Sequence, residues 1–358
     1  MANPNINPSL THYTALEHAK AAHKEYVVIN WCIGNTCNFS CSYCPKGLHD
    51  GSVAWPDVNM VIEFCQKTIK HYRNKKLYFE FTGGEVTLWK DLPVLLDFLK
   101  KSDCRVGIIS NGSRSDVFWQ KILPLLDHVC LSFHPESSKA DHFYQIVELC
   151  SKHIRTHVNF MMHPQYFVEC LTLAYKVKDL EGISIAIQPL TDDMGSDLKD
   201  KNRDLFAYTK TQNKVIETQN AFLAKQIKNN AQFESYRGAM SMVRIDGSRS
   251  SMAPQRFIAA GTNSWEGWSC HVGLEQIVVD TAGDIYRGWC KVKGKVGHIS
   301  DKELRLPVSP VVCDKSHCHC NFDIMATKTK QVKPAVKVVA RKWITNVKNM
   351  VFNSEKGL

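Results

Sequence analysis

The feature that most constrains the fold is an alternation of short β-prone runs with segments of helical character. Six such runs lie between residues 26 and 190, and a polar or amphipathic stretch follows each. This alternation is typical of a parallel sheet or barrel covered by helices. It predicts an α/β fold with its functional groups at the carboxyl ends of the strands. The runs are 26–34, 76–84, 105–112, 128–135, 156–164 and 182–190.

Composition places the chain among ordinary globular proteins. The 358 residues contain no run of about 18 apolar residues, and the N-terminus lacks the charged and apolar regions of a signal peptide, so we expect a cytoplasmic protein. In a reducing compartment, the 14 cysteines are metal ligands, catalytic thiols or core residues more often than disulfides. The net charge of +10 favours an anionic partner, but there is no strong nucleic-acid signal.

The pattern along the chain predicts four regions. We expect a barrel core over 1–195, a mainly helical bridging segment over 196–260, a small α+β domain over 261–325 and a basic amphipathic helix over 326–358. A hairpin is predicted within 274–290, around Asp280, Gly283 and Asp284. Two interpretations of the last helix stay open: it caps the barrel, or it lies on an anionic membrane surface as a peripheral contact.

Three cysteines, Cys37, Cys41 and Cys44, fall in the loop after the first run. Thiolates so close together reach one metal centre at little entropic cost. Structural zinc usually takes four ligands, whereas a cubane iron–sulfur cluster takes one thiolate per iron. Three thiols without a nearby fourth fit three irons of a cubane better, and they leave the fourth iron open.

The spacing Cys37-x3-Cys41-x2-Cys44, with Tyr43 before the last cysteine, resembles the radical S-adenosylmethionine (radical SAM) enzymes. The resemblance implies a partial (β/α)6 TIM-type barrel and a [4Fe-4S] cluster whose open iron binds SAM. It further implies an electron donor such as flavodoxin or ferredoxin, and reductive cleavage of SAM to a 5′-deoxyadenosyl radical.

Further motifs of that family fall at successive strand ends. "FTGGE" ends the second run, "ISNG" the third, "SFHP" the fourth and "IQPL" the sixth. Each has a structural alternative, because Gly-Gly and Asn-Gly are common turn dipeptides and a strand-end histidine is often structural. By resemblance, the SAM-binding residues are Tyr43, Gly83, Gly84, Glu85, Ser110, Asn111, Ser132, His134 and Gln188.

A second group of cysteines lies C-terminal to the predicted barrel. The group resembles SPASM domains and their shortened twitch form, and five cysteines imply one auxiliary [4Fe-4S] cluster. Its spacing departs from that family's pattern, so which four bind is open; structural zinc and free core thiols remain alternatives. The five are Cys270, Cys290, Cys313, Cys318 and Cys320.

The substrate is the least constrained part of the prediction. Polar residues predicted to face the barrel interior include Glu80, Thr82, Asn159 and His163, but no catalytic residue is assigned. About 25 residues precede the first run, too few for a domain that binds a peptide leader. With the positive charge, this favours oxidation, epimerisation or rearrangement of a sugar, nucleotide-sugar or similar metabolite. A peptide maturase forming a crosslink or epimer is the alternative, and a non-catalytic electron-transfer or redox-sensing protein is a third.

Overall fold

The computed structural model describes residues 12–190, 207–225 and 236–330, and the six predicted runs are confirmed as strands. All six pair in parallel and in chain order. Their carboxyl ends therefore lie along one edge of the sheet. The strands are β2 (Tyr26–Gly34), β3 (Lys76–Gly83), β4 (Arg105–Ser110), β5 (His128–Phe133), β6 (Arg155–Met161) and β7 (Ile183–Gln188).

Alternate residues of these strands face opposite sides of the sheet. In β2 the apolar positions Val27, Ile29, Trp31 and Ile33 are almost completely buried in the main hydrophobic core. The intervening positions include the polar Asn30 and face the concave side. This two-residue period gives the curved sheet an apolar outer face and a polar inner face, as a partial barrel with an interior site requires.

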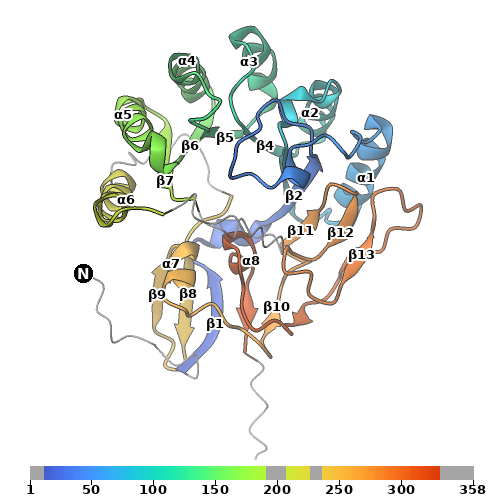
Figure 1. The fold of residues 1–358 in the computed structure, drawn as a ribbon. Coiled ribbons are helices and arrows are strands. Elements are labelled where there is room, and N and C mark those ends of the chain that lie inside the picture. Colours follow the sequence, from blue (N-terminus) through green and yellow to red (C-terminus); the bar gives the residue numbers. More distant parts are fainter. Residues whose placement is uncertain (1–11, 191–206, 226–235, 331–358) are drawn as a thin grey trace, which may run out of the picture.

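Helices cover the outer face of the curved sheet in an arc from α1 to α6 (Figure 1). The first of them begins where the Asp57 side chain accepts hydrogen bonds from the main-chain N–H groups of Asn59 and Met60, a standard N-cap. It buries Val61 and Phe64 in the core. The helices are α1 (Val58–His71), α2 (Leu92–Lys101), α3 (Asp116–Ile122), α4 (Ala140–Ser151), α5 (Phe167–Val177) and α6 (Lys210–Lys225).

The predicted hairpin is confirmed, and it extends the barrel sheet. Strand β11 (Gln276–Val279) pairs with β12 (Asp284–Tyr286), and β12 pairs with β13 (Lys295–His298), both in antiparallel fashion. Strand β11 also runs parallel to β2, with Gln276 opposite Val28 and Val279 opposite Trp31. The result is an open nine-stranded sheet that runs from β13 to β7.

A second, six-stranded antiparallel sheet joins the beginning of the chain to its later parts. It contains a strand near the N-terminus, β1 (Tyr13–His18), which the sequence did not predict. The other five strands come from residues 240–329, and Figure 1 shows this sheet beyond the open side of the barrel. In order, the sheet is β14 (Val311–Val312), β10 (Ser269–Cys270), β15 (Lys328–Thr329), β1, β8 (Met240–Arg244) and β9 (Arg249–Met252).

The expectation of a mainly helical segment over 196–260 is wrong for residues 240–252. These residues form the β8–β9 hairpin, although α6 and α7 (Pro254–Ala259) on either side are helical. The cause is local: Asp246 and Gly247 form the turn, and Gly247 has a φ of 80°, which glycine adopts at little cost. The Asp-Gly dipeptide between Met-rich alternating residues was the missed signal.

Short elements complete the described structure. They are α8 (Asn321–Ile324) and the 3-10 helices η2 (Ala21–Glu25), η3 (Lys46–Leu48), η4 (Val86–Leu88), η5 (Leu123–Leu125) and η6 (Pro164–Tyr166). Within the described residues, every helix is too short or too polar to cross a lipid bilayer. The amphipathic helix expected over 326–358 is wrong at its start, because Lys328–Thr329 form β15, and its remainder from 331 onward lies outside the described residues.

Candidate functional site

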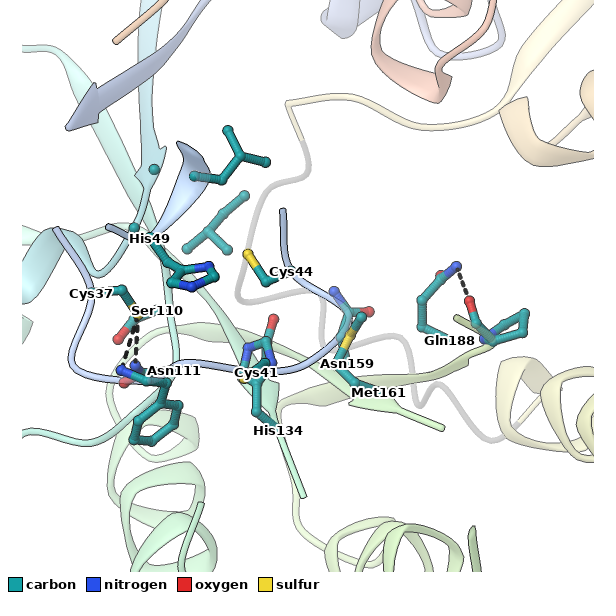
Figure 2. A pocket seen from close by; sticks show the side chains of 17 residues that line it. Cys37, Cys41, Cys44, His49, Ser110, Asn111, His134, Asn159, Met161 and Gln188 are labelled. Carbon is teal, nitrogen blue, oxygen red and sulfur yellow. Dashed lines mark hydrogen bonds between the residues drawn. The ribbon is translucent and has the colours of Figure 1, made fainter. Parts of the chain in front are cut away.

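A pocket of about 460 Å³ lies at the carboxyl ends of the parallel strands. Figure 2 shows Cys37, Cys41 and Cys44 spread along one loop, with Gln188 at the other end of the pocket from Cys37. The structure therefore brings most of the sequence-predicted residues together at one site. The predicted residues in its lining are Cys37, Cys41, Cys44, Gly83, Gly84, Ser110, Asn111, Ser132, His134 and Gln188.

The loop of residues 37–44, here called the three-thiol loop, is only partly open to solvent. Cys41 is buried, whereas Cys37 and Cys44 are half-buried, and the Cys44 N–H donates to the Cys41 carbonyl at 3.0 Å. Burial raises the pKa of the Cys41 thiol to about 11 and that of Cys44 to about 12. Both are protonated at neutral pH when no metal is bound, so binding of metal ions releases protons from this loop.

Asn35, which the sequence analysis missed, holds the chain that follows this loop. Its side chain is buried; the amide nitrogen lies 2.9 Å from Asp50 Oδ1 and 3.0 Å from the Gly47 carbonyl. Its amide oxygen accepts the Val53 N–H at 3.0 Å. A buried polar residue directly after a strand was the available signal. Asn35 fixes residues 47–53, which include the pocket residues Leu48 and His49.

The Gly83–Gly84 pair is needed for the close approach of two strand ends. Gly83 has a φ of 140°, and a Cβ there would lie 2.1 Å from the Gly34 carbonyl oxygen. A Cβ on Gly84 would lie 2.3 Å from the Thr36 carbonyl oxygen. The two glycines therefore let the end of β3 pack against the chain that leads into the three-thiol loop, and they also line the pocket.

Glu85 is fully buried behind the pocket and is not among the residues that line it. Its Oε1 accepts hydrogen bonds from the hydroxyls of Thr87, at 2.6 Å, and Ser110, at 2.8 Å. Its Oε2 accepts the Asn111 N–H at 2.6 Å. Burial raises the pKa of the carboxyl group, although these hydrogen bonds oppose the shift. In this structure Glu85 holds the end of β4 in place.

Asn111 connects the end of β4 to the three-thiol loop. Its amide nitrogen donates to Asn38 Oδ1 at 3.0 Å and lies 3.9 Å from Cys37 Sγ (Figure 2). Its oxygen accepts the Ser113 N–H at 3.0 Å. Asn111, which was predicted to contact the ribose or carboxylate of SAM, is therefore also positioned to donate a hydrogen bond to a thiolate at Cys37.

Tyr43 lies behind the lining, where it supports His134. The Tyr43 hydroxyl and His134 Nδ1 are 2.8 Å apart, and the two rings are stacked with an interplanar angle of 13°. Burial lowers the pKa of His134 to about 4, so the ring is neutral at physiological pH. Tyr43 packs with Cys41, Met161 and Leu190.

Two further polar residues in the lining are Asn159, predicted to face the barrel interior, and His49, which was not predicted. The Asn159 amide nitrogen donates to Cys130 Sγ at 3.3 Å, and its Oδ1 accepts from His157 Nε2 at 3.0 Å. His49 also lines the pocket, and its Nδ1 is buried with no hydrogen-bond partner among the described residues. The lining contains no Lys, Arg, Asp or Glu within the described residues. The site therefore offers thiols, amides, hydroxyls and neutral rings.

The C-terminal cysteines come from the second sheet and its loops and, in the case of Cys290, from the β12–β13 connection of the barrel sheet. Cys270, Cys290 and Cys313 share an apolar cluster, and Cys318 packs in the adjacent one. The fifth, Cys320, is the N-cap of α8. Among the described residues, neither this region nor the three-thiol loop arranges three ligands around a single metal ion. A cubane cluster does not need three ligands around one metal ion, because each of its irons takes one thiolate.

Asp323 orders the turn that carries Cys290. Its side chain is buried, with Oδ1 accepting the Trp289 N–H at 3.0 Å and Oδ2 accepting the Cys290 N–H at 2.6 Å. Oδ1 also accepts from the Gln276 side chain at 3.0 Å. The carboxylate thereby ties α8 to both the Cys290 turn and β11. The sequence analysis did not single out Asp323.

The comparisons with known proteins agree with this geometry. Residues 31–169 match the Radical SAM superfamily. The fold is similar to that of native anSMEcpe with bound AdoMet, with a TM-score of 0.52 and 17% identity over 77% of this chain and 78% of that chain. With bound AdoMet and Kp18Cys peptide, native anSMEcpe gives a TM-score of 0.51 and 18% identity over the same shares.

A third similar fold is that of Streptococcus suis SuiB bound to S-adenosylmethionine. The TM-score is 0.51 at 11% identity, over 78% of this chain and 65% of that chain. No curated protein is similar enough in sequence to match. The matched residues contain the three-thiol loop and the ends of β3, β4 and β5. Residues 31–169 are thus similar to the radical SAM superfamily, in sequence pattern and in the fold that surrounds the pocket.

Proposed function

We propose that this protein is a radical SAM enzyme that removes a hydrogen atom from a polar substrate. The observation that carries the proposal is the position of Cys37, Cys41 and Cys44, which line the same pocket as the ends of β3, β4, β5 and β7. Cys37, Cys41 and Cys44 would hold a [4Fe-4S] cluster, which together with bound SAM would supply the one-electron cleavage of SAM to a 5′-deoxyadenosyl radical. The electron would come from a donor of the flavodoxin or ferredoxin type.

The residues present fit this cofactor pair. Three thiols and no carboxylate line the pocket, a donor set suited to three irons of a cubane. The volume of about 460 Å³ lies within the usual range of ligand pockets, roughly 300–1,000 Å³. The unpartnered Nδ1 of His49 provides an open polar contact for a bound ligand.

The chain's own residues would bind and orient SAM. Ser132, Asn111 and Gln188 offer hydroxyl and amide groups for its ribose, carboxylate and adenine. Neutral His134, held by Tyr43, can accept or donate a hydrogen bond according to its tautomer. Glu85 contributes by positioning Ser110 and Asn111, whereas direct binding of the SAM amino group would require its side chain to rotate out of four hydrogen bonds.

The lining favours a substrate that is polar but uncharged. Phosphates are usually bound by Arg, Lys or main-chain N–H groups, and the described lining has no Arg or Lys. We therefore narrow the sugar or nucleotide-sugar class to a sugar or similar metabolite without a phosphate at this site. A peptide is the second candidate, because the similar fold of anSMEcpe is known with AdoMet and a bound peptide.

We further propose that the C-terminal cysteines hold one auxiliary [4Fe-4S] cluster. The support is that Cys270, Cys290 and Cys313 share one cluster of side chains, with Cys318 and Cys320 close by in the chain. The pKa of Cys320 also indicates that Cys318 and Cys320 lie close together. Burial raises this pKa most, and nearby charges, including that of Cys318, raise it further. Four of these thiolates would close the cluster, which would leave it as an electron acceptor or conduit.

The test is anaerobic reconstitution with iron and sulfide, followed by reduction with SAM and measurement of 5′-deoxyadenosine. The triple variant Cys37→Ala, Cys41→Ala, Cys44→Ala is expected to lose about four irons per chain and all product. Cys104→Ala, a core thiol outside both groups, is the control and should keep both. Wild-type protein that gives no more product than a protein-free sample overturns the proposal and favours a non-catalytic electron-transfer or redox-sensing role.

The substrate class has a separate test. Deuterated sugars and deuterated peptides are offered to the reconstituted enzyme, and deuterium in 5′-deoxyadenosine is measured by mass spectrometry. Transfer from a sugar supports the first candidate, whereas transfer from peptide alone supports the second. The radical chemistry itself is judged by the preceding experiment and does not depend on this outcome.

A further inference from the structure

Lys328 is a completely buried lysine in the second sheet, and it lies among the C-terminal cysteines. Its ammonium group donates to three main-chain carbonyls, those of Asp323 at 2.8 Å, Ala326 at 2.9 Å and Ile324 at 3.2 Å. All three of its donors are thus satisfied by neutral acceptors. The charge also lies 4.8 Å from the centroid of the Trp265 ring.

Two of the ionisable neighbours of Lys328 are thiols, those of Cys270 and Cys318. Strand β15 pairs with β10 so that Lys328 lies directly opposite Cys270, and directly opposite residues of an antiparallel pair place their side chains on the same face. Burial lowers the pKa of Lys328, but negative charge at its neighbours, first Cys270 and Cys318 and then Asp323 and Glu275, outweighs this effect and raises it. None of the ion pairs in the described residues includes Lys328.

A buried ammonium without an opposite charge destabilises the fold, and main-chain carbonyls only partly offset that cost. Thiolates bound to iron would add negative charge beside this ammonium, which protonated thiols do not. The carboxyl groups of Asp323 and Glu275 also interact with Lys328, but each accepts hydrogen bonds from other donors: Asp323 from the Trp289 and Cys290 N–H groups, and Glu275 from the Thr327 N–H group. Lys328 therefore places a buried positive charge beside the C-terminal cysteines.

We propose that Lys328 is the buried counter-charge of a thiolate-ligated iron–sulfur centre at the C-terminal cysteines, and that it raises the reduction potential of that centre. The inference rests on the auxiliary cluster proposed above. One-electron reduction adds a negative charge to the centre, and a fixed positive charge nearby stabilises the reduced form more than the oxidised form. Lys328 acts as a positioning charge and does not ligate iron.

The test is a redox titration of the reconstituted protein, followed by electron paramagnetic resonance, with dithionite as reductant. Lys328→Met keeps the length of the side chain and removes the charge. We expect the reduced-to-oxidised ratio of the C-terminal centre to fall about tenfold at a fixed potential, which is about 59 mV for a one-electron couple. Lys328→Arg keeps the charge and should stay within about threefold of wild type. Lys295→Met removes an exposed lysine paired with Asp284 and should cause no shift.

If Lys328 had only a structural role, the experiments would give different results. Removing this buried charge should leave the midpoint temperature of the apoprotein unchanged or higher, whereas the iron-loaded Lys328→Met variant should melt below loaded wild type. An equal loss of stability in both forms overturns the proposal. So does a Lys328→Met protein with the potential and iron content of wild type.

Failure of the auxiliary cluster is detected separately. Cys270→Ala combined with Cys313→Ala should lower the iron content of wild type by up to about four per chain. If the iron content is unchanged, the proposed second cluster is wrong, and the role of Lys328 as its counter-charge falls with it. If irons are lost but Lys328→Met is indistinguishable from wild type, only the role of Lys328 is wrong.

Discussion

Glu85 places a fully buried carboxyl group beside the candidate site. Its buried carboxylate accepts hydrogen bonds from Thr87, Ser110 and Asn111, so both oxygens face donors. Because these bonds place the end of β4, Glu85 connects a local hydrogen-bond network to the shape of the pocket. A substitution of nearly equal volume can separate this role from packing.

Glu85→Gln is expected to lower the free energy of unfolding by about 1–3 kcal/mol, because the amide NH₂ must face a donor on one side. It should also weaken SAM binding by displacing Asn111. Chemical denaturation and equilibrium dialysis with labelled SAM measure the two effects. Glu63→Gln, at an exposed helix position, is the control and should change stability by less than about 0.5 kcal/mol. Unchanged stability and SAM binding in Glu85→Gln would contradict this account.

His134 predicts a dependence of stability on pH. Burial lowers its pKa from 6.5 to about 4 in the folded protein, so between these values the unfolded chain binds a proton that the folded protein does not. Stability is therefore full above about pH 6.5 and falls as the pH approaches 4, by up to about 3 kcal/mol. Urea unfolding of wild type and His134→Gln between pH 4 and 8 should show a shallower decline in the variant. Parallel declines would show that other groups cause the acid sensitivity.

At the scale of elements, the junction between β2 and β3 shapes the site. Gly84→Ala would place a Cβ 2.3 Å from the Thr36 carbonyl oxygen, which is main chain and cannot rotate away. We expect a loss of about 1–3 kcal/mol and a displaced three-thiol loop. The matched control is Gly47→Ala, since a Cβ there meets nothing within 4 Å. Thermal melting and iron content after reconstitution measure both effects; equal behaviour of the two variants would contradict the packing argument.

The elements also show what the sequence can and cannot predict. All six parallel strands were predicted because their alternation is local, and so was the β11–β12 hairpin with its Gly283 turn. Strand β1 was missed because its partners β8 and β15 lie far along the chain. The pairing of β11 with β2 was missed for the same reason. Long-range pairing leaves no short-range pattern.

At the candidate site, too, features set by local sequence were predicted and features set by long-range packing were not. Strand-end residues such as Ser132 and Asn111 were predicted to meet because parallel strands end along one edge. The burial of Glu85 could not be predicted, because spacing along the chain does not reveal which way a loop side chain turns. His49 was missed since only the fold of residues 47–53 around Asn35 brings it to the pocket.

For the whole molecule, the shared sheet predicts that the barrel and the C-terminal region unfold together. Ile277 on β11 is fully buried in the main core, so Ile277→Ala should cost about 2–5 kcal/mol. Hydrogen exchange at increasing urea, read by mass spectrometry, should show β2 and β10 peptides losing protection together and earlier than in wild type. Val308→Ala, 83% exposed, is the control. A C-terminal region that opens alone, with β2 still protected, would contradict one cooperative unit.

The pairing of the first strands with the last has a consequence for how the protein is made. A chain leaves the ribosome N-terminus first, at about 5–20 residues per second. His18, at the end of β1, meets Glu275 across 257 residues of sequence, so β1 and the outer edge of β2 wait on the order of 10–50 s for their partners. During that time an exposed strand edge can pair with other nascent chains. Soluble yield in a foreign host should therefore respond more to chaperones that act on nascent chains than to mutations that stabilise the finished fold.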